Sequence, residues 1–188
     1  VGRLGDKMPD PTIEGFNPCA EIGLGDGESC NLATIFLPNI ESRAQLVELS
    51  KLLYKVQKAI AAMDYPYEKT NKIVRKNMRL GQSITGVLQS STQQLSWLND
   101  TYTTLRQFDT LYSAKKGLPL SVRLTTVQPS GTLSLLPGVT PGIHPAFARH
   151  YIRRVRFGVS DPLVDRCRKR GYPVCFDVGI DGREDHSR

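Results

Sequence analysis

The clearest hydrophobic pattern in the chain lies between residues 41 and 63. Apolar residues recur there at alternating steps of three and four, the spacing of one face of an α-helix. They are Leu46, Leu49, Leu53, Val56, Ile60 and Met63. Ser42 and Gln45 form a capping-box pattern before this stripe. The pattern predicts an amphipathic helix over 41–63 with the stripe as its apolar face.

The rest of the chain alternates between helical and strand-like segments. Helical patterns recur near 68–78, 82–90, 92–116 and 161–170. Runs of β-branched and apolar residues predict strands at 31–37, 122–127, 153–159 and 174–178. Two stretches rich in Gly and Pro are predicted as loops, 1–18 and 129–145. Strands separated by helices indicate an α/β fold with mainly parallel pairing.

Composition and charge add little to this picture. A hydrophobic share of 39% and a charged share of 23% are ordinary for a soluble globular protein, and no apolar run is long enough to span a membrane. We therefore expect a cytoplasmic protein or a piece of one. The net charge of +7 favours an anionic partner, but it does not choose among nucleotides, nucleic acids and acidic membranes.

The four cysteines show no Cys-x-x-Cys spacing, which disfavours a zinc ribbon or a thioredoxin-type motif. His144 and His186 also lack metal-ligand spacing, so no metal site is predicted. In a cytosolic setting the cysteines would be free thiols or a catalytic redox pair. Cys167 and Cys175 match no motif and are interpreted as core or surface thiols.

Three reactive side chains stand close together at Asn17, Cys19 and Glu21. In an extended segment residues two apart share a face, so an amide, a thiol and a carboxylate would point the same way. Taken alone, this spacing favours a packed cysteine in a loop. Cys30 follows eleven residues after Cys19, and the Gly-rich run 23–27 could return it to the same place. The alternative for Cys30 is a buried cysteine at a strand end.

A second candidate site follows the predicted strand 122–127. Small polar residues with a Gly at a helix start can cradle a phosphate, because free backbone N–H groups bind anions there. The residues concerned are Ser130, Gly131, Thr132, Leu133 and Ser134. The final Gly-Lys-Ser/Thr of a Walker A loop is missing. An ordinary turn with a helix cap remains the alternative.

Together these motifs resemble the ribonucleotide reductases. NPCAEI at 17–22 is similar to their finger-loop signature, which several classes share. PSGTLSLLPGVTPGIHP at 129–145, followed by HYIRRVR at 150–156, is similar to the monomeric, adenosylcobalamin-dependent class II enzymes. The resemblance covers nearly all of the chain. It implies the second half of a ten-stranded α/β barrel, with a finger loop at about 12–31 and a phosphate-binding loop at about 128–136.

The resemblance also implies a reaction, the radical reduction of ribonucleotides, as triphosphates, to 2′-deoxyribonucleotides. Cys19 would become the thiyl radical that takes the ribose 3′-hydrogen, Glu21 would accept the 3′-hydroxyl proton, and Asn17 would position the ribose. Cys30 and a partner cysteine outside the chain would supply the reducing equivalents. Adenosylcobalamin is the implied cofactor and a thioredoxin-like or other dithiol the implied reductant. A dNTP effector would bind outside this chain.

Two other interpretations stay open. The large subunit of a class I ribonucleoside-diphosphate reductase shares the finger motif. A noncatalytic nucleotide- or nucleic-acid-binding domain would account for the charge, but it needs none of Cys19, Glu21 and Cys30. Because no nucleic-acid motif with interleaved aromatics is present, we expect no direct contact with nucleic acid, and none with a membrane. By itself the chain is expected to be inactive and to expose an apolar sheet edge.

Overall fold

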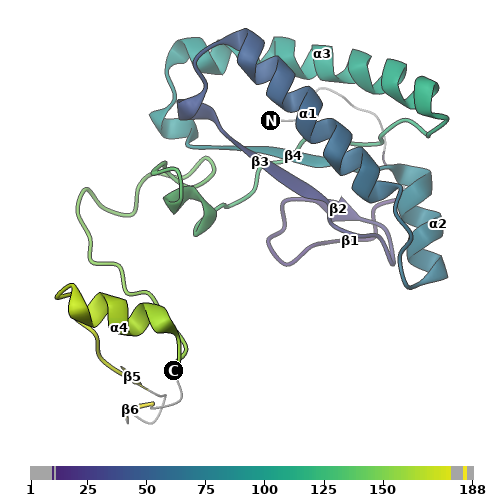
Figure 1. Ribbon diagram of the computed structural model, residues 1–188. Helices are drawn as coiled ribbons and strands as arrows, with labels where there is room; N and C mark the ends of the chain where they lie inside the picture. The colour runs from purple at the N-terminus through teal and green to yellow at the C-terminus, as the bar shows by residue number, and fades with distance from the viewer. Residues whose placement is uncertain (1–9, 11, 179–183, 186–188) are drawn as a thin grey trace. The chain divides into compact units, whose positions relative to one another are not determined.

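The computed structural model describes residue 10, residues 12–178 and residues 184–185. The chain divides into a larger unit, Val1–Ala146, and a smaller one, Phe147–Arg188 (Figure 1). Residues 1–9 and 11 of the predicted loop 1–18, and His186, lie outside the described residues.

A parallel pair of strands forms the centre of the larger unit. β3 (Leu32–Phe36) and β4 (Gly81–Thr85) pair with Leu32 opposite Gly81 and Phe36 opposite Thr85. The predicted strand 122–127 lies along the other edge of β4, where the Gln82 N–H donates to the Leu124 carbonyl at 2.8 Å, although only one regular bridge forms. Within the described residues no other strand pairs with the free edge of β3.

Two long helices pack together beside this sheet, α1 (Arg43–Ala61) and α3 (Thr92–Lys116) (Figure 1). A shorter helix, α2 (Glu68–Asn77), precedes β4. One hydrophobic cluster comprises Tyr54, Ala61, Val74, Met78, Leu80, Leu105 and Leu124. The second comprises Ile35, Leu37, Ile40, Leu46 and Ile84. The clusters join the helices to the sheet, so the helices near 68–78 and 92–116 are confirmed.

The buried face of α1 differs from the predicted stripe. Its buried residues are Leu46, Ser50, Tyr54, Gln57, Lys58 and Ala61. Val56, Ile60 and Met63 are exposed, so for them the prediction of an inward-facing stripe was wrong. The reason is that polar side chains on the inner face find specific partners. Gln57, for example, donates from Nε2 to the backbone carbonyl of Asn31 at 3.0 Å.

The helix ends follow the expected capping chemistry with one difference. Ser42 caps α1 by accepting from the Gln45 N–H, but the Gln45 side chain accepts from Glu41 N–H instead of closing a full box. The complete capping box forms at α3, between Ser91 and Gln94. Gly117 ends α3 with φ +64°, a left-handed conformation that Gly adopts without strain.

The predicted helix at 82–90 was wrong. These residues form β4 and a 3₁₀-helix, η2 (Val87–Gln89), separated by Gly86 with φ +79°. All five residues of β4 are buried, so pairing on both edges outweighs the weak helical pattern. Another 3₁₀-helix, η1 (Leu37–Asn39), follows β3. The prediction of parallel pairing therefore holds for the central sheet.

The smaller unit contains α4 (Pro162–Lys169), with Asp161 accepting from the Leu163 N–H at 2.9 Å as its N-cap. β5 (Asp177–Val178) pairs antiparallel with β6 (Glu184–Asp185). The predicted strand at 153–159 is absent, and only the end of 174–178 is a strand. None of the described residues at 147–178 is buried. Because a strand needs a buried face and partner strands to be stable, these apolar runs do not form the predicted strands.

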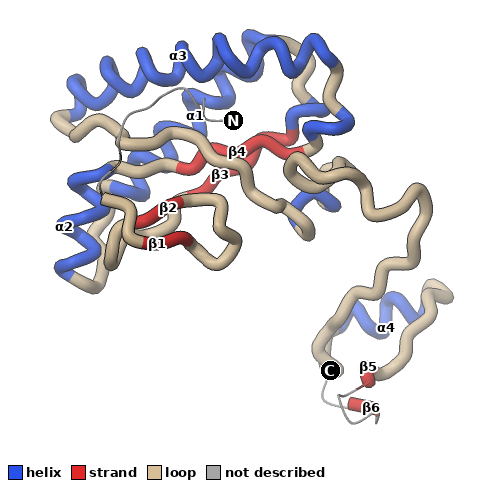
Figure 2. Tube along the Cα trace, turned by 180° about the vertical axis from the view of Figure 1, so that it is seen from behind, coloured by secondary structure: helices blue, strands red, loops and turns tan. Residues whose placement is uncertain are grey.

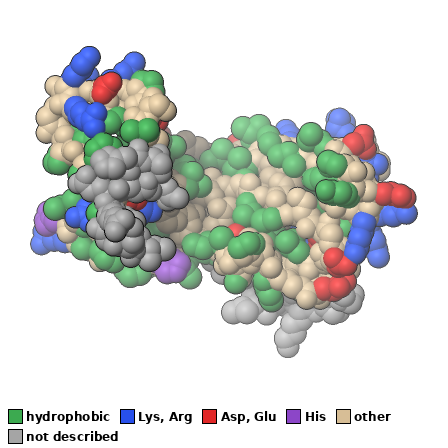
Figure 3. All heavy atoms as spheres, turned by 90° about the horizontal axis from the view of Figure 1, so that it is seen from below, with side chains coloured by type: hydrophobic (Ala, Val, Ile, Leu, Met, Phe, Trp, Pro, Cys, Tyr) green, Lys and Arg blue, Asp and Glu red, His purple; other side chains and the backbone are tan. Residues whose placement is uncertain are grey.

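Charged side chains of the larger unit gather at the end where α2 lies (Figure 3). Lys72 and Glu68 form an exposed ion pair within α2 at 2.7 Å. Lys69 and Arg75 of the same helix pair with Asp26 and Asp64. In the described part of the chain, no helix combines the length and the apolar character needed to cross a bilayer.

A buried ion pair joins α1 to α3. The Lys58 side chain is 0% exposed, and its Nζ lies 3.2 Å from Asp109 Oδ1. Lys58 also donates to Ser121 Oγ and to the Pro119 carbonyl, while Tyr54 donates to Asp109 at 2.6 Å. Burial alone would raise the pKa of Asp109, but the Tyr54 hydrogen bond and the Lys58 charge lower it. The carboxylate therefore stays ionised inside the fold.

We expect Lys58→Met to destabilise the intact protein by about 3–5 kcal/mol, because it leaves the Asp109 carboxylate buried without its cation. The double variant Lys58→Met/Asp109→Leu should be destabilised by less than Lys58→Met, since no charge is then left unpaired. Urea unfolding measures both effects through the transition midpoint. Lys51→Met removes a more exposed pair with Glu48 and serves as the control, with an expected loss below about 1 kcal/mol. A loss that small for Lys58→Met would contradict this account.

Candidate active site

The predicted finger loop is a short hairpin (Figures 1 and 2). β1 (Gly15–Phe16) pairs antiparallel with β2 (Gly23–Leu24), with Gly15 opposite Leu24 and Phe16 opposite Gly23. Residues 17–22 therefore form its tip. The expectation that this segment is extended was wrong, because it turns back on itself.

Hydrogen bonds around Asn17 close the tip. The Asn17 N–H donates to the Ile22 carbonyl at 3.3 Å, and the Ile22 N–H donates to Asn17 Oδ1 at 3.3 Å. The Ala20 N–H donates to the Asn17 carbonyl at 2.9 Å. Ala20 has φ +59°, which a residue with a side chain adopts only at a cost in backbone strain. The tip is thus a tight turn organised by one amide side chain.

The tip brings the predicted reactive side chains to one place. Asn17 Nδ2 donates to Cys30 Sγ at 3.7 Å. Cys30 is an exposed residue. Desolvation around its sulfur is the largest cause that raises its pKa, the charges of Glu21 and Cys19 raise it further, and the Asn17 hydrogen bond lowers it. Cys30 therefore remains a protonated thiol at neutral pH. Cys19 is an exposed free thiol.

Glu21 is held by its backbone and has a free carboxylate oxygen. The Thr126 hydroxyl donates to the Glu21 backbone carbonyl, which ties the hairpin tip to the segment beside β4. Glu21 Oε2 is buried and has no hydrogen-bond partner among the described residues. Buried polar atoms are seldom left unpaired, so this oxygen is suited to accept a hydrogen bond or a proton from a bound molecule.

The predicted phosphate loop keeps part of its expected geometry. A 3₁₀-helix, η3 (Leu133–Leu135), replaces the expected helix start, and Gly131 has open space where a side chain would be. Ser130 has φ +52°, and its buried Oγ lacks a hydrogen-bond partner among the described residues. Ser134 Oγ donates to the Gly131 carbonyl at 3.2 Å, so it is engaged within the loop. Thr132 and Leu133 are exposed.

The same segment connects the phosphate loop to the hairpin. The Gln128 N–H donates to Ser83 Oγ of β4 at 2.8 Å, two residues after Thr126. Thr126 in turn bonds to Glu21. Two candidate sites that lie far apart in the sequence are therefore anchored to one short segment, 126–128.

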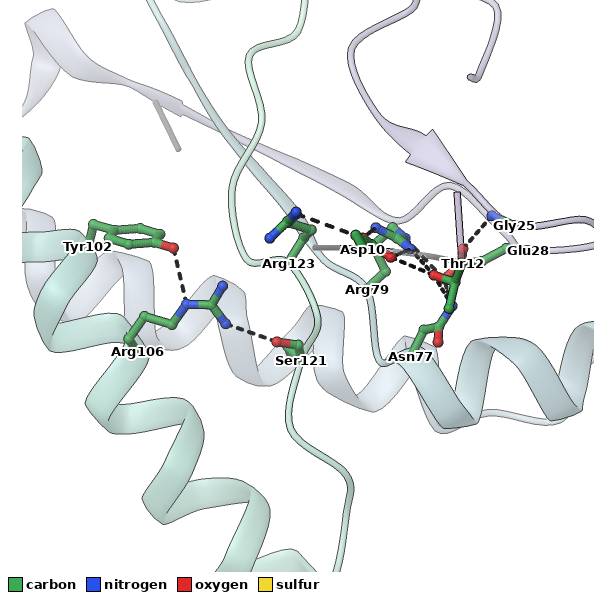
Figure 4. A network of polar contacts seen from close by, with 10 residues as sticks. All are labelled: Asp10, Thr12, Gly25, Glu28, Asn77, Arg79, Tyr102, Arg106, Ser121 and Arg123. Atoms are coloured by element: carbon green, nitrogen blue, oxygen red, sulfur yellow. Dashed lines mark hydrogen bonds and ion pairs between the residues drawn. The ribbon is translucent and has the colours of Figure 1, made fainter. Parts of the chain in front are cut away.

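Sequence reasoning missed a buried ionic network at the base of the hairpin (Figure 4). Arg79 Nη1 and Nη2 donate to the two carboxylate oxygens of Asp10, at 2.6 and 3.3 Å. Arg79 Nε donates to Glu28 Oε1 at 3.1 Å, and Nη2 donates to Thr12 Oγ1 at 2.9 Å. No sequence signal identified these residues, because an isolated Arg after a helix is usually solvated.

Electrostatics support this network. Burial alone would raise the pKa of Asp10, but hydrogen bonds from Arg79 and Thr12, with the charge of Arg79, lower it to about 2. The side chains of Arg79 and Glu28 are each 1% exposed. The Asp10 carboxylate is thus ionised at neutral pH, and its interactions contribute stability that is lost as the pH falls from about 4 toward 2.

The two remaining cysteines lie in the smaller unit. Cys167 is half-buried in α4 and Cys175 is exposed, and both are free thiols. Within the described residues, no group of three or more His, Cys, Asp or Glu side chains could hold a metal ion.

No family model matches the chain. It is 32% identical to the adenosylcobalamin-dependent ribonucleoside-triphosphate reductase of Lactobacillus helveticus, over 94% of this chain and 28% of that protein. It is 34% identical to the Euglena gracilis protein of the same name, over 88% of this chain and 23% of that protein. The chain thus spans about a quarter of the length of these curated relatives.

A solved structure gives the same result. The crystal structure of a B12-dependent, class II ribonucleotide reductase superposes with a TM-score of 0.77 at 27% identity, over 91% of this chain and 28% of that one. Sequence and fold agree over most of the chain. The chain is therefore homologous to a segment of the adenosylcobalamin-dependent ribonucleotide reductases, the family that its finger-loop and PSGT motifs predicted.

Proposed function

We propose that this chain supplies the radical-bearing part of an adenosylcobalamin-dependent ribonucleoside-triphosphate reductase. The observation that carries the proposal is the meeting of Asn17, Cys19, Glu21 and Cys30 at one hairpin tip. The names of the relatives support the substrate class and the cofactor. The chain would form the second half of a ten-stranded α/β barrel, with the hairpin as its central loop.

Each side chain of the tip has a place in the reaction. The Cys19 thiyl takes the ribose 3′-hydrogen atom and later returns it. The free Glu21 oxygen accepts the 3′-hydroxyl proton, which suits a carboxylate without a protein partner. The 2′-hydroxyl leaves as water, and Cys30 with a second cysteine supplies two electrons and two protons as the two thiols form a disulfide. Asn17 bonds the substrate and keeps Cys30 in place.

The tip fits a radical source that binds outside the hairpin. Cys19 is exposed, so its sulfur can be reached by a group held elsewhere in the protein. When bound, adenosylcobalamin supplies the radical that removes the hydrogen atom from this thiol. Cys19 is the residue that would face it, and we assign no other residue of the chain to hold the cofactor.

The remaining interactions follow from the same proposal. Residues 130–134 would bind the substrate phosphates through backbone N–H groups and the free Ser130 hydroxyl. A thioredoxin-like or other dithiol would reduce the disulfide after each turnover, and a dNTP effector would bind outside this chain. We place the reaction in the cytoplasm, where thiols such as Cys30 stay reduced.

The rival functions make different demands on the site. A noncatalytic nucleotide-binding domain has no use for a cysteine held by Asn17 beside an unpaired carboxylate oxygen. A class I ribonucleoside-diphosphate reductase would use the same tip but would need a separate radical-generating subunit. Turnover that depends on that subunit and not on adenosylcobalamin would favour the class I alternative.

Substitution of the two tip cysteines should separate their roles in the full-length protein. Cys19→Ser should abolish hydrogen abstraction, because a serine O–H bond is too strong for the cofactor-derived radical to open. Cys30→Ser should still allow abstraction but leave the substrate radical without its reductant, so that it decomposes and releases free base. Adenosylcobalamin and a 3′-labelled ribonucleoside triphosphate are supplied, and label loss and base release are measured.

Cys167→Ser, in the smaller unit, is the matched control and should turn over like the unaltered protein. Label loss and base release should appear with Cys30→Ser and be absent with Cys19→Ser. The opposite pattern, or equal behaviour of the two variants, would show that the cysteine roles are misassigned. The 188-residue chain alone should show no turnover, since the second reducing cysteine lies outside it.

A paired substitution tests the phosphate loop. Ser130→Ala removes the hydroxyl but keeps the strained positive φ, whereas Ser130→Gly removes the hydroxyl and relieves the strain. If the hydroxyl binds a substrate phosphate, both variants should raise KM about tenfold, the value of one lost hydrogen bond to a charged group. Steady-state kinetics with a ribonucleoside triphosphate measures this. A normal KM for Ser130→Gly would show that backbone strain, not phosphate binding, explains the effect of Ser130→Ala.

A further inference from the structure

Arg79 contacts both ends of the hairpin. It follows α2 and directly precedes the buried Leu80 and strand β4. It binds Asp10 and Thr12, which come before β1, and Glu28, which comes after β2 (Figure 4). One guanidinium therefore fixes the entry and the exit of the hairpin to the start of the central strand.

The two strands of the hairpin contribute few contacts of their own, and at its base Asp10 is also 3.7 Å from Arg123 Nε. β1 and β2 share only two residue pairs, and such short hairpins are marginal in water. The contacts of Arg79 with Asp10 and Glu28, which we call the clamp, are extended by Glu28. Its carboxylate also accepts from the Gly25 N–H at 2.8 Å and from Asn77 Nδ2 at 3.0 Å. The exit strand is therefore held by the same carboxylate that binds Arg79.

We propose that Arg79 is a positioning residue for the radical site, because its clamp on Asp10 and Glu28 keeps Cys30 beside Asn17 at the hairpin tip. Cys30 lies two residues after Glu28, whereas Asn17 lies on the entry side of the tip. Without the clamp the two sides can shift past each other, and the contact between Asn17 and Cys30 opens. This inference rests on the proposed function, although Arg79 itself touches no reacting atom.

The guanidinium is required for its shape as well as its charge. Its two terminal nitrogens, Nη1 and Nη2, donate to the two oxygens of Asp10, while Nε donates to Glu28. A lysine ammonium is a point donor and cannot span these two carboxylates in the same way. Arg79→Lys should therefore keep one contact and retain part of the positioning.

The test compares Arg79→Met, Arg79→Lys and Lys58→Met in the full-length protein. Lys58→Met is the control, because it breaks a buried ion pair of similar burial that lies between α1 and α3 and not at the hairpin. The first readout is the rate at which iodoacetamide alkylates Cys30, followed by peptide mass spectrometry. The second is kcat and KM with adenosylcobalamin and a ribonucleoside triphosphate.

In Arg79→Met, iodoacetamide should alkylate Cys30 at least about threefold faster than in the unaltered protein. The reason is that the thiol moves away from Glu21 and Cys19, whose charges raise its pKa. The kcat of this variant should fall about 100-fold, the cost of a displacement on the order of 1 Å in a reacting group, with KM within about threefold. Arg79→Lys should give an alkylation rate and a kcat between those of Arg79→Met and the unaltered protein. Lys58→Met should keep both the alkylation rate and kcat within about threefold at a temperature where it is folded.

Normal alkylation and normal kcat in folded Arg79→Met would overturn the proposal, and so would equal changes in Lys58→Met. If Arg79→Met does not fold, Arg79→Lys and Glu28→Gln decide the question by the same two readouts. If the unaltered full-length protein reduces no ribonucleotide, the proposed function fails. The alkylation rates then still decide whether Arg79 positions Cys30.

Discussion

Strand β4 is buried along its whole length, with β3 hydrogen-bonded to one edge and residues 122–126 to the other. Each part of the candidate site is attached to it. Arg79 at its start holds the hairpin base, Ser83 within it holds Gln128, and its neighbouring segment carries Thr126, which bonds to Glu21. β4 has a full ladder with β3 on one edge and the hydrogen bonds of one bridge on the other, so it is a rigid reference for a loop that has only two residue pairs of its own.

This arrangement requires charged side chains to be buried, which is unfavourable unless each charge is paired. The larger unit encloses two ionic clusters, one around Lys58 and Asp109 and one around Arg79. Such clusters add little net stability, but loss of one member is expensive because it leaves a charge unpaired in a medium of low dielectric. They therefore select one arrangement of helix, strand and hairpin over its alternatives. This specificity matters most at the hairpin, since alternative placements of the tip would separate Asn17 from Cys30.

The sequence predicted the long helices and the site motifs, and it failed where tertiary contacts decide. α3 was found because the spacing of its apolar residues and the Gly117 that ends it are local signals. β4 was mistaken for a helix because its strand character comes from pairing with residues about fifty positions earlier and forty later. The α1 face was misassigned because Lys58, a polar residue, is buried by a partner on another helix. Asn17, Cys19, Glu21 and Cys30 were found as a motif on a predicted finger loop, but the hydrogen bonds that close its tip were not predicted. The roles of these four side chains and the phosphate loop remain predictions.

The candidate site residues are placed partly by neighbouring residues in the sequence and partly by residues far away in it. The motif at 17–22 sets which groups are present and how the turn closes, through Asn17 and the positive φ of Ala20. Where the turn lies is decided by Arg79 and Thr126, which are far away in the sequence and carry no recognisable signature. In the proposed function a thiyl radical must be close to its substrate and away from other hydrogen donors, so an error in the position of the tip would lower the rate steeply even with the cysteine present. The chemistry of the site is therefore encoded in the motif, while its precision depends on ionic and hydroxyl contacts that the motif does not contain.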